Sequence, residues 1–180
     1  MRCAVLCPGP SLPRFAEVQD QYETRIGINR AVMAFPCQWW VFADHAIYTD
    51  TRPPGLLTCF APTTFVSQDA LDALGKRGLI GGGYEWVNWK SRYDFVSVQT
   101  GWRTFSVTAA LVLAGSLGFK QIDCFGCDQT NAPDWDGGKP RGMYRTTQRW
   151  DDERRVWDRT TAELMDRHGV TVRRMNLGPA

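Results

Sequence analysis

The chain has 180 residues, of which 43% are hydrophobic and 22% are charged, and these proportions are typical of one globular domain. Its 21 basic and 19 acidic residues give a net charge of +2, which is too weak a field to indicate nucleic-acid binding. No apolar stretch approaches the roughly 20 residues of a membrane span, and the first residues do not form a secretory signal. We therefore expect a cytoplasmic protein whose six cysteines stay reduced.

Short apolar segments alternate with helical patterns along the first half of the chain. Residues 2–7 are typical of a buried strand, and we expect Ser11 to cap a helix from Leu12 to Gln21. The segment 81–100 combines glycines with alternating aromatics, which predicts an irregular strand or hairpin at one edge of the sheet. Between these segments we expect strands at 24–29, 37–44, 55–61 and 63–67 and a helix at 70–78.

The second half has a stronger pattern. A helix rich in alanine and leucine begins near Phe105 and stops at Gly118, and a strand follows from Gln121 to Phe125. Residues 129–147 have no periodicity, and a loop of that length predicts a functional lid or disorder. An amphipathic helix at 148–168 and a strand at 170–176 complete the chain.

This alternation of strands and helices predicts one α/β domain spanning residues 1–180. Right-handed crossovers between such strands give an open, doubly wound, mostly parallel, Rossmann-like sheet with helices on both faces.

Ligands bind such sheets at the carboxyl ends of the strands, where this sequence has small and polar residues. A tight glycine corner between the first strand and a capped helix leaves free backbone amides, which form a cradle for a phosphate. An ordinary strand-to-helix turn is the alternative. The strand ends carry Gly9, Pro10 and Ser11; Asn29 and Arg30; Asp44 and His45; and Gly126, Cys127 and Asp128.

Four cysteines form two close pairs, which raises the question of a zinc site. Cys3 and Cys124 fall inside strand patterns, where cysteine behaves as a small buried hydrophobe. We therefore expect no zinc site at Cys3, Cys7, Cys124 and Cys127.

Four segments, in this order, resemble one superfamily. CPGPSL resembles the G-x-G-P-S-L corner of the group that contains small GT-A-like bacterial sialyltransferases, archaeal hydroxymethylpterin diphosphokinases and flagellin-modification proteins. GINRAV resembles the second strand of that group. TGWRTFSVTAALVLAGSLGFKQIDCFGCD resembles its helix and strand ending in G-x-D, and ELMDRHGVTVRRMNLGPA its closing helix and strand, ending here at Asn176.

The resemblance implies a bound nucleotide or nucleotide sugar, with Asp128 on the acidic position of the family. A Mg²⁺ ion between Asp44 and Asp128 would suit the phosphates of such a ligand, whereas Asp44 could instead cap the helix that follows it. The residues that the resemblance puts around the nucleotide are Gly9, Pro10, Ser11, Asn29, Ser106 and Asp128.

The sequence also departs from the family. Cys7 replaces the first glycine of the corner, and Gln129 and Thr130 replace the tyrosines after G-x-D. The sialyltransferases have a general-base histidine in that segment, and this chain has none there. His45 is the candidate base, although an exposed residue at a helix start is the alternative.

The lid at 129–147 offers further ligand contacts. Its cations could clamp phosphates and its aromatic side chains could stack on a base or a sugar, or the segment could be a solvated basic loop. The residues concerned are Lys139, Arg141, Arg145, Trp135 and Tyr144.

These observations predict a nucleotide-binding transferase, with glycosyl transfer from a nucleotide sugar as the leading reaction. One alternative is Mg²⁺-dependent transfer of diphosphate from ATP to a small alcohol. The other is a non-catalytic binding or accessory module, for instance one encoded by a phage and present in the host cytoplasm. We expect a small nucleotide ligand, no nucleic acid and no membrane span, and the sequence does not indicate an oligomeric state.

Overall fold

The computed structural model describes residues 1–50, 63–80, 85–89, 105–138 and 147–175. Within these residues, seven strands form one sheet in the order β5-β4-β3-β2-β1-β6-β7, and every pairing is parallel. The predicted α/β fold is therefore confirmed. The strands are β1 (Arg2–Leu6), β2 (Thr24–Ile28), β3 (Trp39–Phe42), β4 (Thr63–Val66), β5 (Glu85–Asn88), β6 (Gln121–Phe125) and β7 (Thr171–Arg174).

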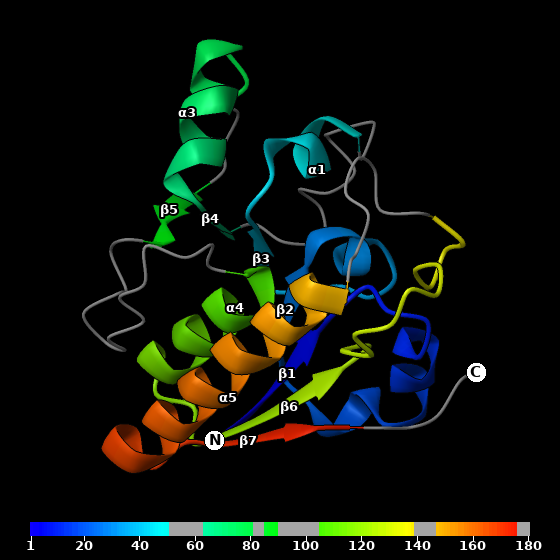
Figure 1. The fold of residues 1–180 in the computed structure, drawn as a ribbon, viewed down its shortest axis with the longest axis vertical. Helices are drawn as coiled ribbons and strands as arrows, with labels where there is room; N and C mark the ends of the chain where they lie inside the picture. The colour runs from blue at the N-terminus through cyan, green and yellow to red at the C-terminus, as the bar shows by residue number, and fades with distance from the viewer. Residues whose placement is uncertain (51–62, 81–84, 90–104, 139–146, 176–180) are drawn as a thin grey trace.

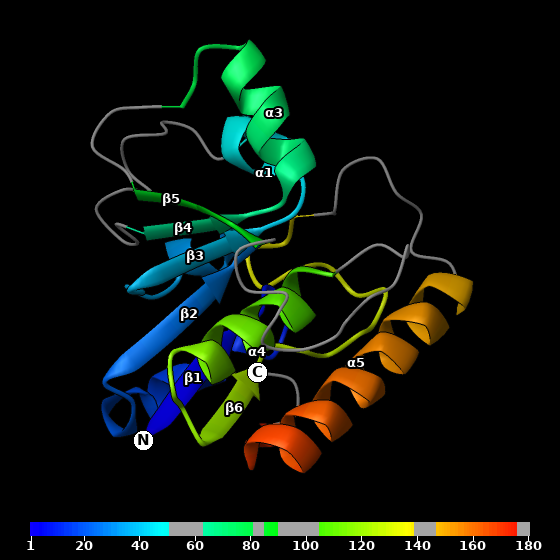
Figure 2. The ribbon, with the colours of Figure 1, turned by 90° about the vertical axis from the view of Figure 1, so that its left-hand side faces the viewer.

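Helices cover both faces of this sheet (Figure 1, Figure 2). The helices α4 (Ser106–Ser116) and α5 (Thr147–His168) lie side by side on one face. The other face carries η1 (Leu12–Glu17), η2 (Gln19–Gln21), η3 (Asn29–Met33), α1 (His45–Asp50) and α3 (Gln68–Lys76). Among the described residues, no helix is long and apolar enough to cross a membrane.

Each face has its own core, because side chains alternate along the strands. On β1, Cys3 and Val5 pack with the residues of α4 and α5, whereas Ala4 and Leu6 pack under the helices of the other face. α4 is buried along almost its whole length, since its small and aliphatic residues lie between the sheet and α5.

The predicted helix after β1 is wrong in type, because it consists of two short 3₁₀ segments, η1 and η2. Ser11 makes no side-chain cap here, since its hydroxyl is hydrogen bonded to Asp128 instead. The segment at 85–88 is a parallel strand at the edge of the sheet. The helix α3 is capped by Ser67 and begins at Gln68, two residues earlier than expected. The strand predicted at 55–61 and part of the lid lie outside the described residues.

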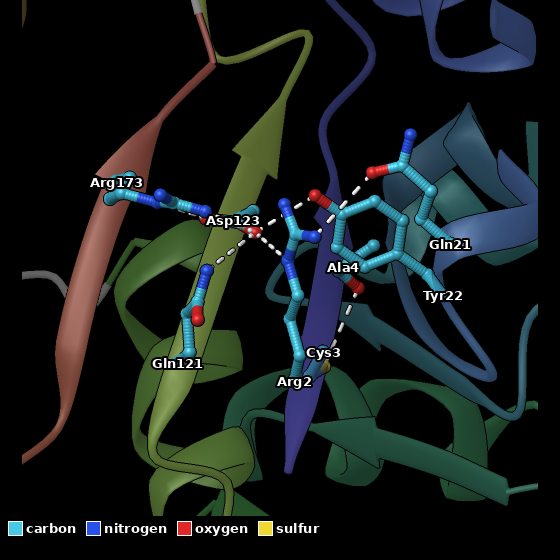
Figure 3. Close-up of polar contacts among 8 residues, drawn as sticks. All are labelled: Arg2, Cys3, Ala4, Gln21, Tyr22, Gln121, Asp123 and Arg173. Carbon is cyan, nitrogen blue, oxygen red and sulfur yellow. Dashed lines mark hydrogen bonds and ion pairs between the residues drawn. The ribbon is translucent and has the colours of Figure 1, made fainter. Parts of the chain in front are cut away.

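A buried carboxylate links β1, β6 and β7, which are the last three strands at one edge of the sheet (Figure 3). Asp123 on β6 is fully buried and accepts hydrogen bonds from Arg173 on β7 at 2.7 and 3.0 Å and from Tyr22 at 2.8 Å. Arg2 on β1 forms a third charged contact at 2.5 Å. Burial opposes ionisation, but the hydrogen bonds from Arg173, Arg2 and Tyr22 outweigh it and hold the pKa of Asp123 below its ordinary value.

Candidate functional site

The candidate site is a cavity at the carboxyl ends of β1, β2 and β6, with a volume of about 120 Å³. From β1 the chain moves outward through β2 to β5, then crosses back so that β6 pairs with the other edge of β1. This reversal is the switch point at which open α/β sheets bind ligands. The walls are the loops after β1 and β6, the end of β2 and the first turns of α4 and α5.

The corner after β1 faces Asp128, as the sequence predicts, but its amides are occupied. Ser11 donates to the Asp128 carboxylate twice, from its amide at 2.9 Å and from its hydroxyl at 2.6 Å. The Gly9 amide donates to the Gly126 carbonyl at 2.9 Å, and the Leu12 amide donates to the Gly9 carbonyl at 3.0 Å. Since proline has no amide hydrogen, the prediction of free amides at this corner is wrong for this state of the protein.

Two glycines allow the loops after β1 and β6 to approach each other. A Cβ atom on Gly9 would collide with the Gly126 carbonyl and with the Asp128 carboxylate. Gly126 has a φ of +65°, and a Cβ atom there would collide with the Cys7 carbonyl. The two loops therefore require glycine at positions 9 and 126, because their backbones lie against each other.

Two non-glycine residues of the lining adopt left-handed backbone conformations, Asn29 and Gln129, each with a φ of 50°. The carbonyl of Asn29 accepts a hydrogen bond from the Trp40 indole at 2.7 Å, which fixes the end of β2. The Gln129 side-chain carbonyl accepts from Arg174 at 2.7 Å, whereas its buried Nε2 has no acceptor among the described residues. Such conformations and orphaned donors cluster at ligand sites.

The first turns of α4 and α5 bring positive potential to the cavity. Ser106 and Val107 of α4 line it, and the first-turn amides of a helix have no partner within the helix. Arg149, near the start of α5, also lines the cavity and pairs with Glu153 at 3.1 Å. The indole of Trp150 donates to Asn131 at 2.9 Å, which connects α5 to the segment after β6.

Six of the predicted site residues line this cavity, and Ser11 contacts it through Asp128; the six are Gly9, Pro10, Asn29, Ser106, Gly126 and Asp128. Arg30 does not line it. Its guanidinium pairs with Asp136 at 2.8 Å and with Asp134 at 3.2 Å, and so holds the segment after β6 against the end of β2.

Asp44 and His45 lie away from the cavity lining. The carboxylate of Asp44 accepts from the Ala46 amide at 2.9 Å, so Asp44 caps α1 as in the alternative interpretation. β3 is separated from β6 by β2 and β1, a distance of about 14 Å at the usual strand spacing. His45 Nδ1 lies 3.7 Å from the Asp44 carboxylate, at the start of α1.

The basic clamps predicted in the lid, Lys139, Arg141 and Arg145, and the aromatic Tyr144 lie outside the described residues. Trp135 is partly buried against the core of the second face, and its amide donates to the Pro8 carbonyl at 3.0 Å. The described part of the segment is thus attached to the corner after β1.

The described residues do not fit a protein-held metal ion. Among them no cluster of three or more histidine, cysteine, aspartate or glutamate side chains has the geometry to hold one. The acids of the cavity are paired individually: Asp128 with Ser11, Asp134 with Arg30 and Glu153 with Arg149. We therefore assign no step to Mg²⁺.

The sequence interpretation missed Arg149, Trp150 and Glu153 as lining residues. Their signal was present in the sequence, because Arg149 and Glu153 are four residues apart in the first turns of a predicted helix. Only the packing of α5 beside α4 brings that turn to the end of β6.

Solved structures with this fold include sialyltransferases at low sequence identity. The sialyltransferase CstII in complex with a trisaccharide acceptor and CMP matches with a TM-score of 0.63 and 9% identity, over 99% of this chain and 82% of that one. CstII from Campylobacter jejuni with CMP matches with a TM-score of 0.62 and 9% identity, over 96% and 79% of the two chains. The apo α-2,3-sialyltransferase from the same organism matches with a TM-score of 0.59 and 14% identity, over 99% of this chain and 76% of that one.

At such identities the likeness shows the fold alone. No protein-family model matches the chain, and no curated protein matches it by sequence.

Proposed function

We propose that this chain binds a nucleotide in the cavity at the β1–β6 switch point and transfers a glycosyl group from a nucleotide sugar. The observation that carries the proposal is the convergence of the Gly9 corner, Asp128 and the start of α4 at that point of the sheet. The support from comparison is that neighbours with the same fold are sialyltransferases solved with CMP.

In this proposal the phosphate of the ligand binds at the start of α4. The hydroxyl of Ser106 and the first-turn amides supply neutral donors, and Arg149 supplies a charge that stabilises the leaving nucleotide. The cavity, at about 120 Å³, is smaller than the roughly 300 Å³ of a small-molecule site, so it accommodates the phosphate end rather than a whole nucleotide.

Asp128 is the proposed general base. It is the acid of the cavity that is hydrogen bonded to neutral donors, whereas Asp134 and Glu153 are paired with arginines. On ligand binding, Asp128 exchanges its contact with Ser11 for the acceptor hydroxyl, and the Ser11 amide becomes available to the phosphate.

A non-catalytic nucleotide-binding module is the second candidate, and one observation favours it. Neither histidine of the chain, His45 or His168, is among the described residues of the cavity lining, so no imidazole there is available as a base.

Two measurements test the proposal. Calorimetric titration with CMP, UDP, GDP and ATP, each with and without Mg²⁺, is expected to give binding of at least one nucleotide without a metal requirement. Release of sugar from the matching nucleotide sugar, followed by NMR, then separates the transferase from the module.

The matched variants are Asp128→Asn and, on the exposed part of α5, Asp158→Asn. The first is expected to retain nucleotide binding while losing at least about 100-fold in turnover, the typical contribution of a general base, and the second to leave both unchanged. Binding without turnover in the parent protein would establish the module. Absence of binding by every nucleotide would refute both candidates.

A further inference from the structure

Two thiols lie together at the cavity. Cys7 directly follows β1, Cys127 lies two residues beyond β6, and both line the cavity. Their side chains belong to the same hydrophobic core, the one that α4 and α5 cover. Cys7 is buried, whereas Cys127 is only half-buried, so a small reagent that enters the cavity meets Cys127 first.

The backbone brings these thiols onto the same face of the sheet. On β6, Ile122 and Cys124 point toward α4 and α5, whereas Phe125 packs into the opposite core. Regular alternation would direct Cys127 to that opposite side as well. The left-handed conformation of Gly126 interrupts the alternation, and Cys127 therefore packs against the core to which Cys7 belongs.

Main-chain contacts hold the two positions in this register. The Cys7 amide donates to the Phe125 carbonyl at 2.8 Å, and the Gly9 amide donates to the Gly126 carbonyl at 2.9 Å. Cys7 and Cys127 thus lie on adjacent segments and on the same side of the sheet, an arrangement that a disulfide requires.

We propose that Cys7 and Cys127 form a reversible disulfide, made by exchange with a small disulfide such as oxidised glutathione, that closes the cavity to its ligand. The formation of the bond is independent of the proposed function, whereas its effect on the ligand rests on that function.

The exchange consumes one molecule of oxidised glutathione. The Cys127 thiolate attacks one sulfur of the oxidant and expels glutathione thiolate, and the Cys7 thiolate then attacks the mixed disulfide at Cys127 and expels the second. The two cysteines are oxidised by two electrons, the oxidant is reduced to two thiols, and these take up the two protons that the cysteines lose.

Cys127 is the attacking thiol for two reasons. It is the more accessible of the pair, and its interaction with the neighbouring Cys7 side chain lowers its pKa below the ordinary value of a thiol. Burial opposes that shift, and the positive charge of Arg174 reinforces it. The pKa of Cys7 lies well above its ordinary value, because of its interaction with the Cys127 side chain and because of burial.

The bond would fix the two loops that must separate for the ligand. It ties Cys7, two residues before Gly9, to Cys127, the neighbour of Asp128. Asp128 would then remain on the Ser11 amide and hydroxyl, and that amide would stay unavailable to a phosphate. Reduction restores the exchange of partners that the proposed function requires.

Peptide mapping of the intact chain tests the disulfide without any nucleotide. The reduced protein is incubated with oxidised glutathione, free thiols are alkylated, and linked peptides are identified by mass spectrometry. We expect a linked pair containing Cys7 and Cys127 that disappears after treatment with dithiothreitol.

Mapping overturns the proposal if both cysteines are recovered fully alkylated, or if Cys7 is linked to Cys124, its neighbour in the same core. The matched variants are Cys127→Ser, which must abolish the link, and Cys37→Ser, which must preserve it because Cys37 is buried in the opposite core. Since the parent protein carries the decisive readout, a poorly folding variant does not affect the result.

Calorimetric titration with CMP tests the effect on the ligand. The oxidised protein is expected to bind at least tenfold more weakly than the reduced protein, with full recovery on reduction. If the oxidised and reduced proteins bind CMP with equal affinity, the disulfide does not close the cavity and that part of the proposal is overturned. If neither form binds CMP or the other nucleotides, the control of the cavity and the proposed function fail together, and the mapped disulfide stands.

Discussion

The side chain and the amide of Ser11 both donate to one carboxylate, that of Asp128, across 117 positions of sequence. This contact joins the loop after β1 to the loop after β6, and both loops line the cavity. It also gives Asp128 neutral partners, in contrast to the arginine-paired acids beside it.

Replacing Ser11 with alanine removes the hydroxyl donor to a charged acceptor. We expect the variant to lose about 1–2 kcal/mol in the free energy of unfolding, measured by urea titration at neutral pH. Ser116→Ala is the control, because that hydroxyl donates to the Leu113 carbonyl of its own helix, at 2.8 Å. Equal losses in the two variants would argue against a special contribution from the Ser11–Asp128 contact.

The close approach of the two loops predicts an intolerance of any side chain at Gly9. Gly9→Ala is expected to cost about 2 kcal/mol or more in stability, because the added Cβ collides with the Gly126 carbonyl and the Asp128 carboxylate. At Gly75, in the last turn of α3, the nearest atom to an added Cβ is 3.4 Å away, and Gly75→Ala is expected to stabilise by about 0.5 kcal/mol. Urea unfolding followed by circular dichroism measures both; a Gly9→Ala protein of unchanged stability contradicts the geometry of the corner.

The lowered pKa of Asp123 predicts that the stability of the protein depends on pH. Its folded-state pKa is lowered, so its ionised form stabilises the protein above the ordinary pKa of about 4, and this stabilisation is lost as the pH falls through the lowered value. Asp123→Asn should therefore cost about 3 kcal/mol near pH 7 and progressively less below about pH 4. Urea titrations across this range measure the difference, with the exposed Asp158→Asn as control. A cost that does not change with pH would falsify the assignment.

If the proposed function holds, replacing Arg149, which lines the cavity, should weaken the binding of the nucleotide. Arg149→Gln is expected to raise the dissociation constant of the bound nucleotide about tenfold, which corresponds to one charged hydrogen bond of about 1.4 kcal/mol. Arg154→Gln lies on the same helix and breaks an exposed pair with Asp151, so its affinity should equal that of the parent protein. Calorimetric titration compares the two variants; equal affinities would remove Arg149 from the ligand contacts.

Much of the fold could be predicted from local pattern. Residues 121–125 form a short, mostly apolar segment between two glycines, Gly118 and Gly126, and β6 has those bounds. The Ala/Leu-rich segment before it is apolar on all sides, as a helix buried between a sheet and a second helix must be. The 3₁₀ segments after β1 were not predictable in this way, since the partner that takes the Ser11 hydroxyl from its capping role is far away in the sequence.

The candidate site was predictable only in part. The rule that ligands bind at strand ends selects Gly9, Asn29 and Asp128 correctly as neighbours, but it also selects Asp44, because sequence alone does not tell how many strands separate two strand ends. Asp123 was missed for a related reason. A carboxylate inside an apolar strand has meaning only once the register puts Arg173 directly opposite it.

The central position of β1 has a consequence for synthesis on the ribosome. β1 can pair with β2 as soon as residues 24–28 have emerged, but its other edge is completed by β6, at residues 121–125. β1 thus keeps one row of hydrogen-bonding groups uncovered until residues 121–125 have been translated. We expect folding to be slow for this size and nascent chains that end before β6 to aggregate or to recruit chaperones.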